Sequence, residues 1–191
     1  MSLYLMFFPV VPGPSEISFE DGFLYPRAEM VHNAIDIIGT PGMTIVSPII
    51  GRVVTSCRLG GERRPGVGTS PRGGNYLVLA DLDGNFHYFA HMQAPSPLQA
   101  GALVAAGTRI GLLGDSGIAR GNPHLHYQVW GPFTHEGAAA EYTSGEFVYR
   151  FHDPINPYSE LAKWAVVFGA RRNAGGRYSI PAAGAAAATA P

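Results

Sequence analysis

Hydrophobic and polar residues alternate over short stretches through most of the chain, a pattern typical of β-strands that are half-buried in a sheet. Strands are predicted where β-branched and aromatic residues gather, at 35–38, 44–47, 49–57, 75–81, 86–91, 109–113 and 125–130. Between two of these strands, the Asp83-Gly84 pair predicts a hairpin turn. The pattern therefore indicates a mostly β protein, with a small antiparallel sheet or barrel-like single domain.

One short helix is predicted near the C-terminus. Asn156 is a capping residue type, and Pro157 is favoured at the first helical position. Apolar residues then recur at helical spacing, at Leu161, Trp164, Ala165 and Phe168, before Gly169.

The domain organisation follows from these limits. We expect an N-terminal segment that packs on the domain (1–22), the main domain (23–157), the helix (158–170) and a flexible tail rich in Ala, Gly and Pro (171–191). Two long loops are predicted inside the main domain, at 58–74 and 131–145. The arginines of the first loop would either lie in solvent or attract a substrate carboxylate.

Composition and charge exclude several classes of protein. The formal net charge is -1, so the chain lacks the basic footprint of a nucleic-acid-binding protein. A single cysteine, Cys57, excludes an intramolecular disulfide and a cysteine-built metal site. The longest apolar run, 3–12, is about half the length that a membrane span needs, and the first residues fit a signal peptide poorly.

Histidines carry the candidate chemistry. His124-Leu125-His126 places two imidazoles on one face of a predicted strand, and His91 ends another strand, where it shares a face with His87 if that strand is regular. His32 and Asp36 form an H-x-x-x-D spacing, but an extended strand would hold them about 13 Å apart, at roughly 3.3 Å per residue. His32 must therefore lie on a bend or bulge if both residues bind one ion.

Two histidines and one aspartate form a three-ligand zinc set that leaves a fourth position open, as hydrolytic zinc sites require. Further histidines would then serve in proton transfer. His87, His135 and His152 are interpreted as surface or packing residues.

With these motifs the chain resembles the lysostaphin-type (LytM-like) zinc metallopeptidases, which are peptidoglycan endopeptidases. The resemblance covers about 23–157 and rests on several blocks in the same order and spacing: HNAIDI (32–37), PGMTIVSPIIGRVV (41–54), GNYLVL (74–79), HYFAHM (87–92), GALVAAGTRIGLLG (101–114) and GIARGNPHLHYQV (117–129). The chain departs from the family at Ala34, where Gly is frequent.

The resemblance implies a role for each matching residue. His32, Asp36 and His126 would hold one Zn²⁺ per chain, His91 and His124 would be the catalytic pair, and Tyr25 would support the transition state. It also implies a groove in the β-domain and hydrolysis of stem or cross-bridge peptides of peptidoglycan by a zinc-activated water. We expect a monomer without a membrane span that acts on the cell wall, in the periplasm or outside the cell.

Two other interpretations stay open. Gly114-Asp115-Ser116-Gly117 is similar to the sequence around the nucleophile of trypsin-like proteases, which would make the protein a serine hydrolase. The second alternative is a non-catalytic module of the same fold that binds the cell wall or activates an amidase.

Overall fold

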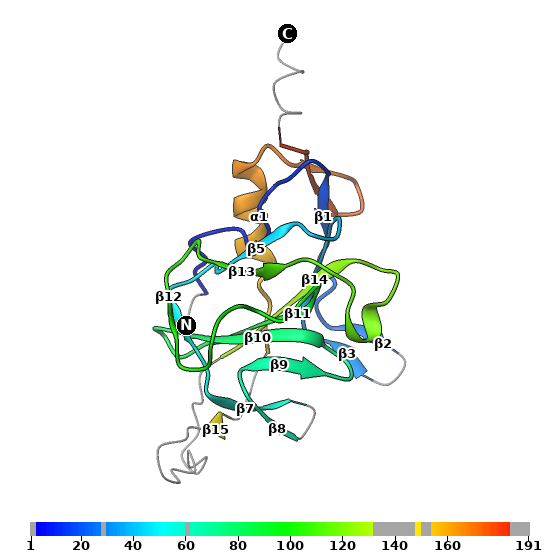
Figure 1. Cartoon of the computed structure of the whole chain (residues 1–191). Coiled ribbons are helices and arrows are strands. Elements are labelled where there is room, and N and C mark those ends of the chain that lie inside the picture. The colour runs from blue at the N-terminus through cyan, green and yellow to red at the C-terminus, as the bar shows by residue number, and fades with distance from the viewer. Residues whose placement is uncertain (1–2, 28–29, 60–61, 132–147, 150–153, 184–191) are drawn as a thin grey trace.

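A computed structural model of the chain describes residues 3–27, 30–59, 62–131, 148–149 and 154–183 (Figure 1). Within these residues the elements are β1 (Ile17–Phe19), β2 (Tyr25–Arg27), β3 (Met30–His32), β4 (Ile35–Ile38), β5 (Thr44–Val46), β6 (Gly51–Val53), β7 (Ser56–Leu59), β8 (Glu62–Arg64), β9 (Val67–Ser70), β10 (Gly74–Asp81), β11 (Phe86–Met92), β12 (Leu103–Val104), β13 (Arg109–Leu112), a 3-10 turn (Gly117–Ala119), β14 (His124–Trp130), β15 (Val148–Tyr149), β16 (Pro154–Ile155), α1 (Tyr158–Val167), β17 (Arg171–Arg172) and β18 (Tyr178–Ile180).

A large antiparallel sheet organises the molecule. Its strands follow the order β12-β6-β10-β11-β14-β4-β1-β18-β17, with β16 added to β14 and β9 added to β10. Smaller sheets pair β13 with β5, β7 with β8 and β15, and β2 with β3. The predicted mostly β, antiparallel class with a short C-terminal helix is therefore confirmed, and the sheet is larger than predicted.

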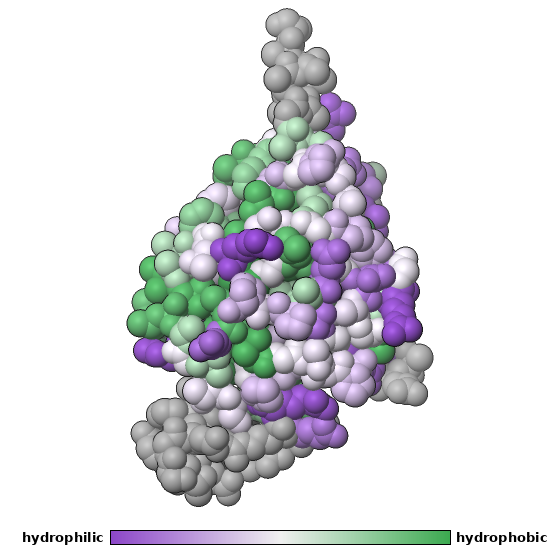
Figure 2. Space-filling model, in the orientation of Figure 1, coloured by the Kyte–Doolittle hydropathy of each residue, from purple (hydrophilic) through white to green (hydrophobic). Residues whose placement is uncertain are grey.

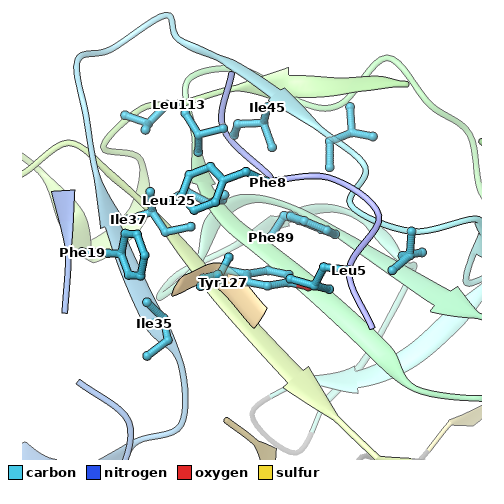
Figure 3. Packing of buried hydrophobic residues seen from close by; sticks show 14 of the residues in the cluster. Leu5, Phe8, Phe19, Ile35, Ile37, Ile45, Phe89, Leu113, Leu125 and Tyr127 are labelled. Carbon is cyan, nitrogen blue, oxygen red and sulfur yellow. The ribbon is translucent and has the colours of Figure 1, made fainter. Parts of the chain in front are cut away.

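The two faces of this sheet have different surroundings. Residues Leu125, Tyr127 and Val129 of β14 point into the main hydrophobic core, together with the N-terminal segment and α1 (Figure 3). Because neighbouring residues of a strand point to opposite faces, His124 and His126 point the other way. On that second face, Tyr88 packs beside His126 with their ring centroids 6.1 Å apart.

Two predicted segments differ from the structure. The strand expected over 49–57 is two strands, β6 and β7, which belong to different sheets. The loop expected over 58–74 contains β8 and β9, and β9 pairs with β10. The surrounding stretch is rich in Gly and Pro, which are poor strand formers, so backbone pairing with neighbouring strands decided the conformation against local preference. The loop predicted at 131–145 lies outside the described residues, apart from Gly131.

A flexible tail was predicted from Arg171 onward, and this prediction is wrong for residues 171–180. There β17 and β18 form a hairpin, and β18 pairs with β1. Ile180 is fully buried, and the ring of Tyr178 stacks on Phe19 with centroids 5.4 Å apart. The sequence did not reveal this hairpin because too few apolar residues occur here to show the alternation of a strand. Packing against β1 stabilises the hairpin instead.

The helix α1 begins where the sequence predicts. The side-chain oxygen of Asn156 accepts the N–H of Tyr158 at 2.9 Å, which satisfies one of the unpaired donors of the first turn. The helix ends at Val167, before the predicted limit, and Gly169 follows with a φ of 70°. A glycine tolerates this left-handed conformation, which ends a helix.

Surface polarity differs between the two sides of the molecule. Figure 2 shows hydrophobic residues gathered on the side of β12, and polar residues on the side of the β2–β3 hairpin. The exposed apolar side chains include Phe7, Ile50 and Leu103. In the described part of the chain, every helix is too short or too polar to cross a membrane.

Candidate active site

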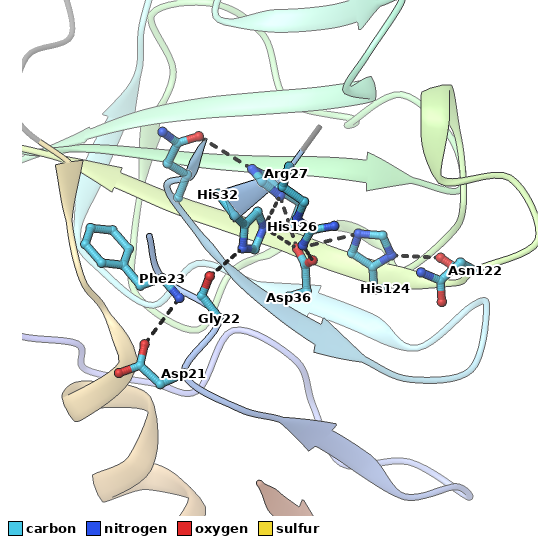
Figure 4. Close-up of polar contacts among 10 residues, drawn as sticks. Asp21, Gly22, Phe23, Arg27, His32, Asp36, Asn122, His124 and His126 are labelled. Carbon is cyan, nitrogen blue, oxygen red and sulfur yellow. Dashed lines mark hydrogen bonds and ion pairs between the residues drawn. The ribbon is translucent and has the colours of Figure 1, made fainter. Parts of the chain in front are cut away.

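Three predicted ligands converge at one end of the second sheet face. His32 comes from the β2–β3 hairpin, Asp36 from β4 and His126 from β14, and β4 and β14 pair so that Asp36 lies opposite His126 (Figure 4). Asp36 Oδ1 lies 3.1 Å from His32 Nε2 and 3.1 Å from His126 Nδ1. The two imidazole nitrogens are 3.3 Å apart.

The chain bends between the first two of these residues. Residues 33–34 separate β3 from β4, and the backbone bends at Ala34, whose side chain is fully buried. This bend replaces the extended geometry that would separate the ends by about 13 Å. A bend between His32 and Asp36 is therefore present, although it lies at Ala34 and not at His32 itself, which ends β3.

Backbone and side-chain partners direct the lone pairs of the two imidazoles inward. His32 Nδ1 lies 3.0 Å from the carbonyl oxygen of Gly22, which can only accept a hydrogen bond. We therefore assign the proton to Nδ1, so that Nε2 offers a lone pair to the site. His126 Nε2 faces the side-chain oxygen of Gln128 at 3.5 Å, which leaves His126 Nδ1 as its inward lone pair. Two nitrogen lone pairs and a carboxylate oxygen then point at one another, and such a set of acceptors can bind a cation.

The spacing of these atoms fits zinc. Two ligands of a tetrahedral zinc ion, each about 2.0–2.1 Å from the metal, lie about 3.3–3.4 Å apart. The three ligand atoms of His32, Asp36 and His126 are separated by 3.1, 3.1 and 3.3 Å. They form a potential metal site whose ligand types and spacing suit zinc.

Asp36 carries the negative charge of this site. Burial raises its pKa, but the interactions with His126 and His32 lower the pKa by more, so that it lies well below its usual range. The carboxyl group is therefore ionised at neutral pH. Its second oxygen, Oδ2, accepts a hydrogen bond from Arg27 Nη2 at 3.0 Å.

His91 and His124 lie together beside the three ligands. Their ring centroids are 4.8 Å apart, and His91 lies 5.7 Å from the ring of His126. His91 Nδ1 donates to the carbonyl of Ser116 at 2.8 Å, and His124 Nδ1 donates to the carbonyl of Asn122 at 2.7 Å. Each ring is thereby left with an unprotonated Nε2, and that of His124 lies 3.6 Å from Asp36 Oδ1.

A β-bulge turns His91 toward this cluster. Leu77 pairs with Phe89 and Asn75 pairs with Met92, so β11 has one residue more than β10 across this interval. His91 adopts a φ of 64°, which is uncommon for a residue with a side chain. The shared face of His91 and His87 was predicted only for a regular strand; the bulge makes β11 irregular and turns His91 to the opposite face.

The electrostatic surroundings keep the pair neutral. Burial and, to a lesser extent, the nearby His124 and His126 lower the pKa of His91 to about 4. Burial also lowers the pKa of His124, although Asp36 opposes this shift. Both imidazoles are therefore able to accept a proton at neutral pH.

The remaining predicted residues have other surroundings. Tyr25 lies opposite His32 in the β2–β3 register, and 57% of its surface is exposed. His87 is fully buried on the other sheet face, where it bonds Tyr127 and Asp81. The surface interpretation of His87 is therefore wrong, and the packing interpretation holds. His135 and His152 lie outside the described residues.

Ser116 does not have the geometry of a serine nucleophile. Its hydroxyl donates to the carbonyl of Met92 at 2.7 Å and accepts the N–H of Asn75 at 2.9 Å. The contact between Ser116 and His91 uses the carbonyl oxygen of Ser116. The hydroxyl therefore holds two backbone segments together. The sequence similarity to trypsin-like proteases is not accompanied by a serine nucleophile bonded to a histidine.

Several contributors to the site are absent from the sequence prediction. The carbonyls of Gly22, Ser116 and Asn122 orient three imidazoles, and a carbonyl leaves no side-chain signature. Arg27 was also missed, although its position five residues before His32 in the same predicted hairpin region was the available signal.

A comparison with family models matches residues 30–140 of this chain to the model described as peptidase family M23. The matched residues are more than half of the 191-residue chain and contain all five clustered histidine and aspartate residues.

Solved structures share the fold. The lytM protein of Ruminococcus gnavus ATCC 29149, which its name describes as a glycyl-glycine endopeptidase, superposes with a TM-score of 0.61 at 24% identity over 83% of this chain. The chain spans 59% of the length of that protein. The catalytic domain of the antimicrobial peptidase lysostaphin from Staphylococcus simulans gives a TM-score of 0.53 at 22% identity, over 78% of this chain and 92% of that domain.

Proposed function

This chain belongs to peptidase family M23, and from that premise we propose that it is a zinc-dependent metalloendopeptidase that hydrolyses peptide bonds in bacterial peptidoglycan. The observation that carries the proposal is the convergence of His32, Asp36 and His126 at zinc-ligand spacing beside a neutral histidine pair. In this proposal the three residues hold the metal, and His91 and His124 are catalytic.

Zinc held at this site would supply a Lewis acid that polarises the scissile carbonyl and lowers the pKa of a water molecule. The chain's own residues provide the proton transfers. His91 and His124 each present an unprotonated Nε2, so one imidazole accepts the proton of water and returns it to the leaving amine. The imidazole that has taken this proton can donate its new Nε2–H to the developing oxyanion before it protonates the leaving amine. The other imidazole, with Nε2 unprotonated, accepts a hydrogen bond from the attacking water and orients it.

The backbone carbonyls make this machinery rigid. Because Ser116 and Asn122 fix the Nδ1–H groups, neither ring needs to change its tautomer before it accepts a proton. Tyr25, on the exposed side of the β2–β3 hairpin, is the proposed support for the tetrahedral transition state. A substrate would reach it from solvent.

The proposed substrates are the stem or cross-bridge peptides of peptidoglycan, so the protein would act on the cell wall. Family membership and the resemblance of the motifs to lysostaphin-type enzymes support this choice. The names of the two solved structures, an endopeptidase for glycyl-glycine and an antimicrobial peptidase, agree with a peptide substrate.

Digestion of purified peptidoglycan, followed by mass spectrometry of the soluble fragments, tests the proposal. We expect new peptide termini with the zinc-loaded protein, and none after chelation or with His126→Ala, which removes a ligand. Elemental analysis should find zinc in the wild type and none in the variant. A wild type that takes up no zinc when zinc is supplied, and that binds the wall without cleaving it, would overturn the proposal and favour the non-catalytic module.

A further inference from the structure

The two carboxylate oxygens of Asp36 have different partners. Oδ1 lies 3.1 Å from His32 Nε2, 3.1 Å from His126 Nδ1 and 3.6 Å from His124 Nε2. Oδ2 accepts a hydrogen bond from Arg27 Nη2 at 3.0 Å. Oδ1 therefore faces the metal site, and the guanidinium of Arg27 holds Oδ2 at the edge of that site (Figure 4).

This division matters because a carboxylate can bind a metal through one oxygen or through both. A zinc site that works in hydrolysis has three protein ligand atoms and keeps the fourth position open. If Asp36 used both oxygens, the fourth position would be taken by its own Oδ2. An occupied Oδ2 therefore preserves the open position.

We propose that Arg27 is a positioning residue, which binds Asp36 Oδ2 so that Asp36 offers only Oδ1 to the metal. This inference rests on the proposed zinc site and adds a residue to it. Arg27 does not touch the metal or the substrate in this role, and it acts through Asp36.

The fold brings Arg27 to this place through the same hairpin that carries the first ligand. In the β2–β3 register, Tyr25 pairs with His32 and Arg27 pairs with Met30. His32 is itself fixed through Nδ1 to the carbonyl of Gly22. The hairpin therefore reaches Asp36 at two points, with an imidazole at Oδ1 and a guanidinium at Oδ2.

Stability does not explain this ion pair. The side chain of Arg27 is 54% exposed, and an ion pair with so exposed a partner contributes little to folding. The guanidinium has a fixed, planar arrangement of donors, which suits it to hold a carboxylate oxygen in one direction. The contact is therefore best explained by the orientation of Asp36.

The test measures the coordination of the metal rather than hydrolysis. Co²⁺ replaces zinc in such sites, and its visible d–d absorption is strong in a four-coordinate site and weaker when a further ligand binds. Spectra of Co²⁺-loaded wild type, Arg27→Ala and Arg27→Lys are compared, and zinc affinity is measured by competition with a chromophoric chelator. Arg177→Ala is the matched control, because Arg177 forms a similarly exposed pair with Glu20 at 3.1 Å.

We expect the Arg27→Ala spectrum to weaken and shift, and its zinc affinity to fall by about 10–100-fold, as is usual when a partner of a metal ligand is removed. Arg27→Lys, which keeps the charge and a donor, should restore much of the wild-type spectrum, and Arg177→Ala should leave it unchanged. If Arg27→Ala keeps the wild-type spectrum and zinc affinity, the inference about Arg27 is overturned and the proposed function is not affected. A wild type that binds neither Co²⁺ nor zinc would overturn the proposed function as well.

Discussion

The imidazole rings of His91 and His124 lie 4.8 Å apart, centroid to centroid, and each donates its Nδ1–H to a backbone carbonyl. Different backbone features place the two histidines side by side. His124 begins β14 in a regular register, whereas His91 reaches the same face through a bulge and a φ of 64°. Strained backbone of this kind persists only where the surrounding structure holds it in place, and it gathers at functional sites.

This pair should be separable from the metal ligands by mutation. We expect His124→Ala and His91→Ala to keep zinc, because neither residue belongs to the three-ligand set, and to lose hydrolysis by about 10²–10⁴-fold, the usual contribution of a general acid–base. Release of dye from labelled cell wall measures activity, and elemental analysis measures zinc. Full activity in both variants would show that neither imidazole is catalytic.

The sequence predicted the fold best where one physical signal acted alone. The alternation at 35–38 predicted β4, whose residues are alternately buried and partly exposed. The aromatic-rich run at 86–91 predicted most of β11, in which every residue is buried. The strands β8 and β9 were missed because they lie in a stretch rich in Gly and Pro, and their pairing with the neighbouring β7 and β10 outweighs that local preference.

Within the candidate site, side-chain types were predictable and orientations were not. The spacing of His32, Asp36, His124 and His126 follows directly from the chain and from the β4–β14 register. The bulge that redirects His91 depends on a mismatch in length between two strands, which no local motif encodes. The orienting carbonyls depend on loops whose course tertiary packing decides.

Gly117 and Gly121 both adopt a positive φ, but close contacts restrict only Gly117. Gly117 has a φ of 71°, and an added Cβ would lie 2.4 Å from the carbonyl oxygen of Arg72 and 2.4 Å from the nitrogen of Gly74. Gly121 has a similar φ of 79° but open space around the same position. Comparison of alanine variants at these two positions therefore separates steric contact from backbone strain.

We expect Gly121→Ala to lose about 1–2 kcal/mol of stability from the positive φ alone. Gly117→Ala should lose about 1–3 kcal/mol more, since its methyl group must displace backbone atoms. It should also reduce hydrolysis, because Gly117 follows Ser116, which holds His91. Urea denaturation measures the difference, and equal losses at both positions would show that the contact relaxes freely.

The polar group around Asp81 predicts a dependence of stability on pH. Burial raises the pKa of Asp81, but hydrogen bonds from His87 and Asn85 lower it by more, and the net shift is downward. A carboxyl with a lowered folded-state pKa stabilises the protein above the unfolded-state pKa of about 3.9, and that stabilisation is lost as pH falls through the folded value.

Asp81→Asn should therefore be less stable than the wild type at pH 7, by about 1.5–3 kcal/mol for the loss of charged hydrogen bonds. The deficit should begin to shrink as the pH falls below about 4, where the carboxyl of the unfolded chain becomes protonated, and it should disappear only below the lowered folded-state pKa. Asp83→Asn, in the same turn and exposed, is the control and should change little. A deficit that is constant from pH 7 to pH 3 would mean that Asp81 acts by shape rather than by charge.

Removal of zinc should destabilise the folded chain, because the three ligands join separate parts of it. His32 belongs to the small β2–β3 sheet, while Asp36 and His126 belong to the large sheet, so a shared ion would link the two sheets. A ligand present at 100 times its dissociation constant stabilises the folded state by about 2.7 kcal/mol, which corresponds to roughly 5–10 °C in Tm for a domain of this size. Thermal melts with and without chelator should show that loss, and added zinc should reverse it. His126→Ala should melt at one temperature under all of these conditions, whereas a chelator-dependent shift in that variant would place the stabilising ion elsewhere.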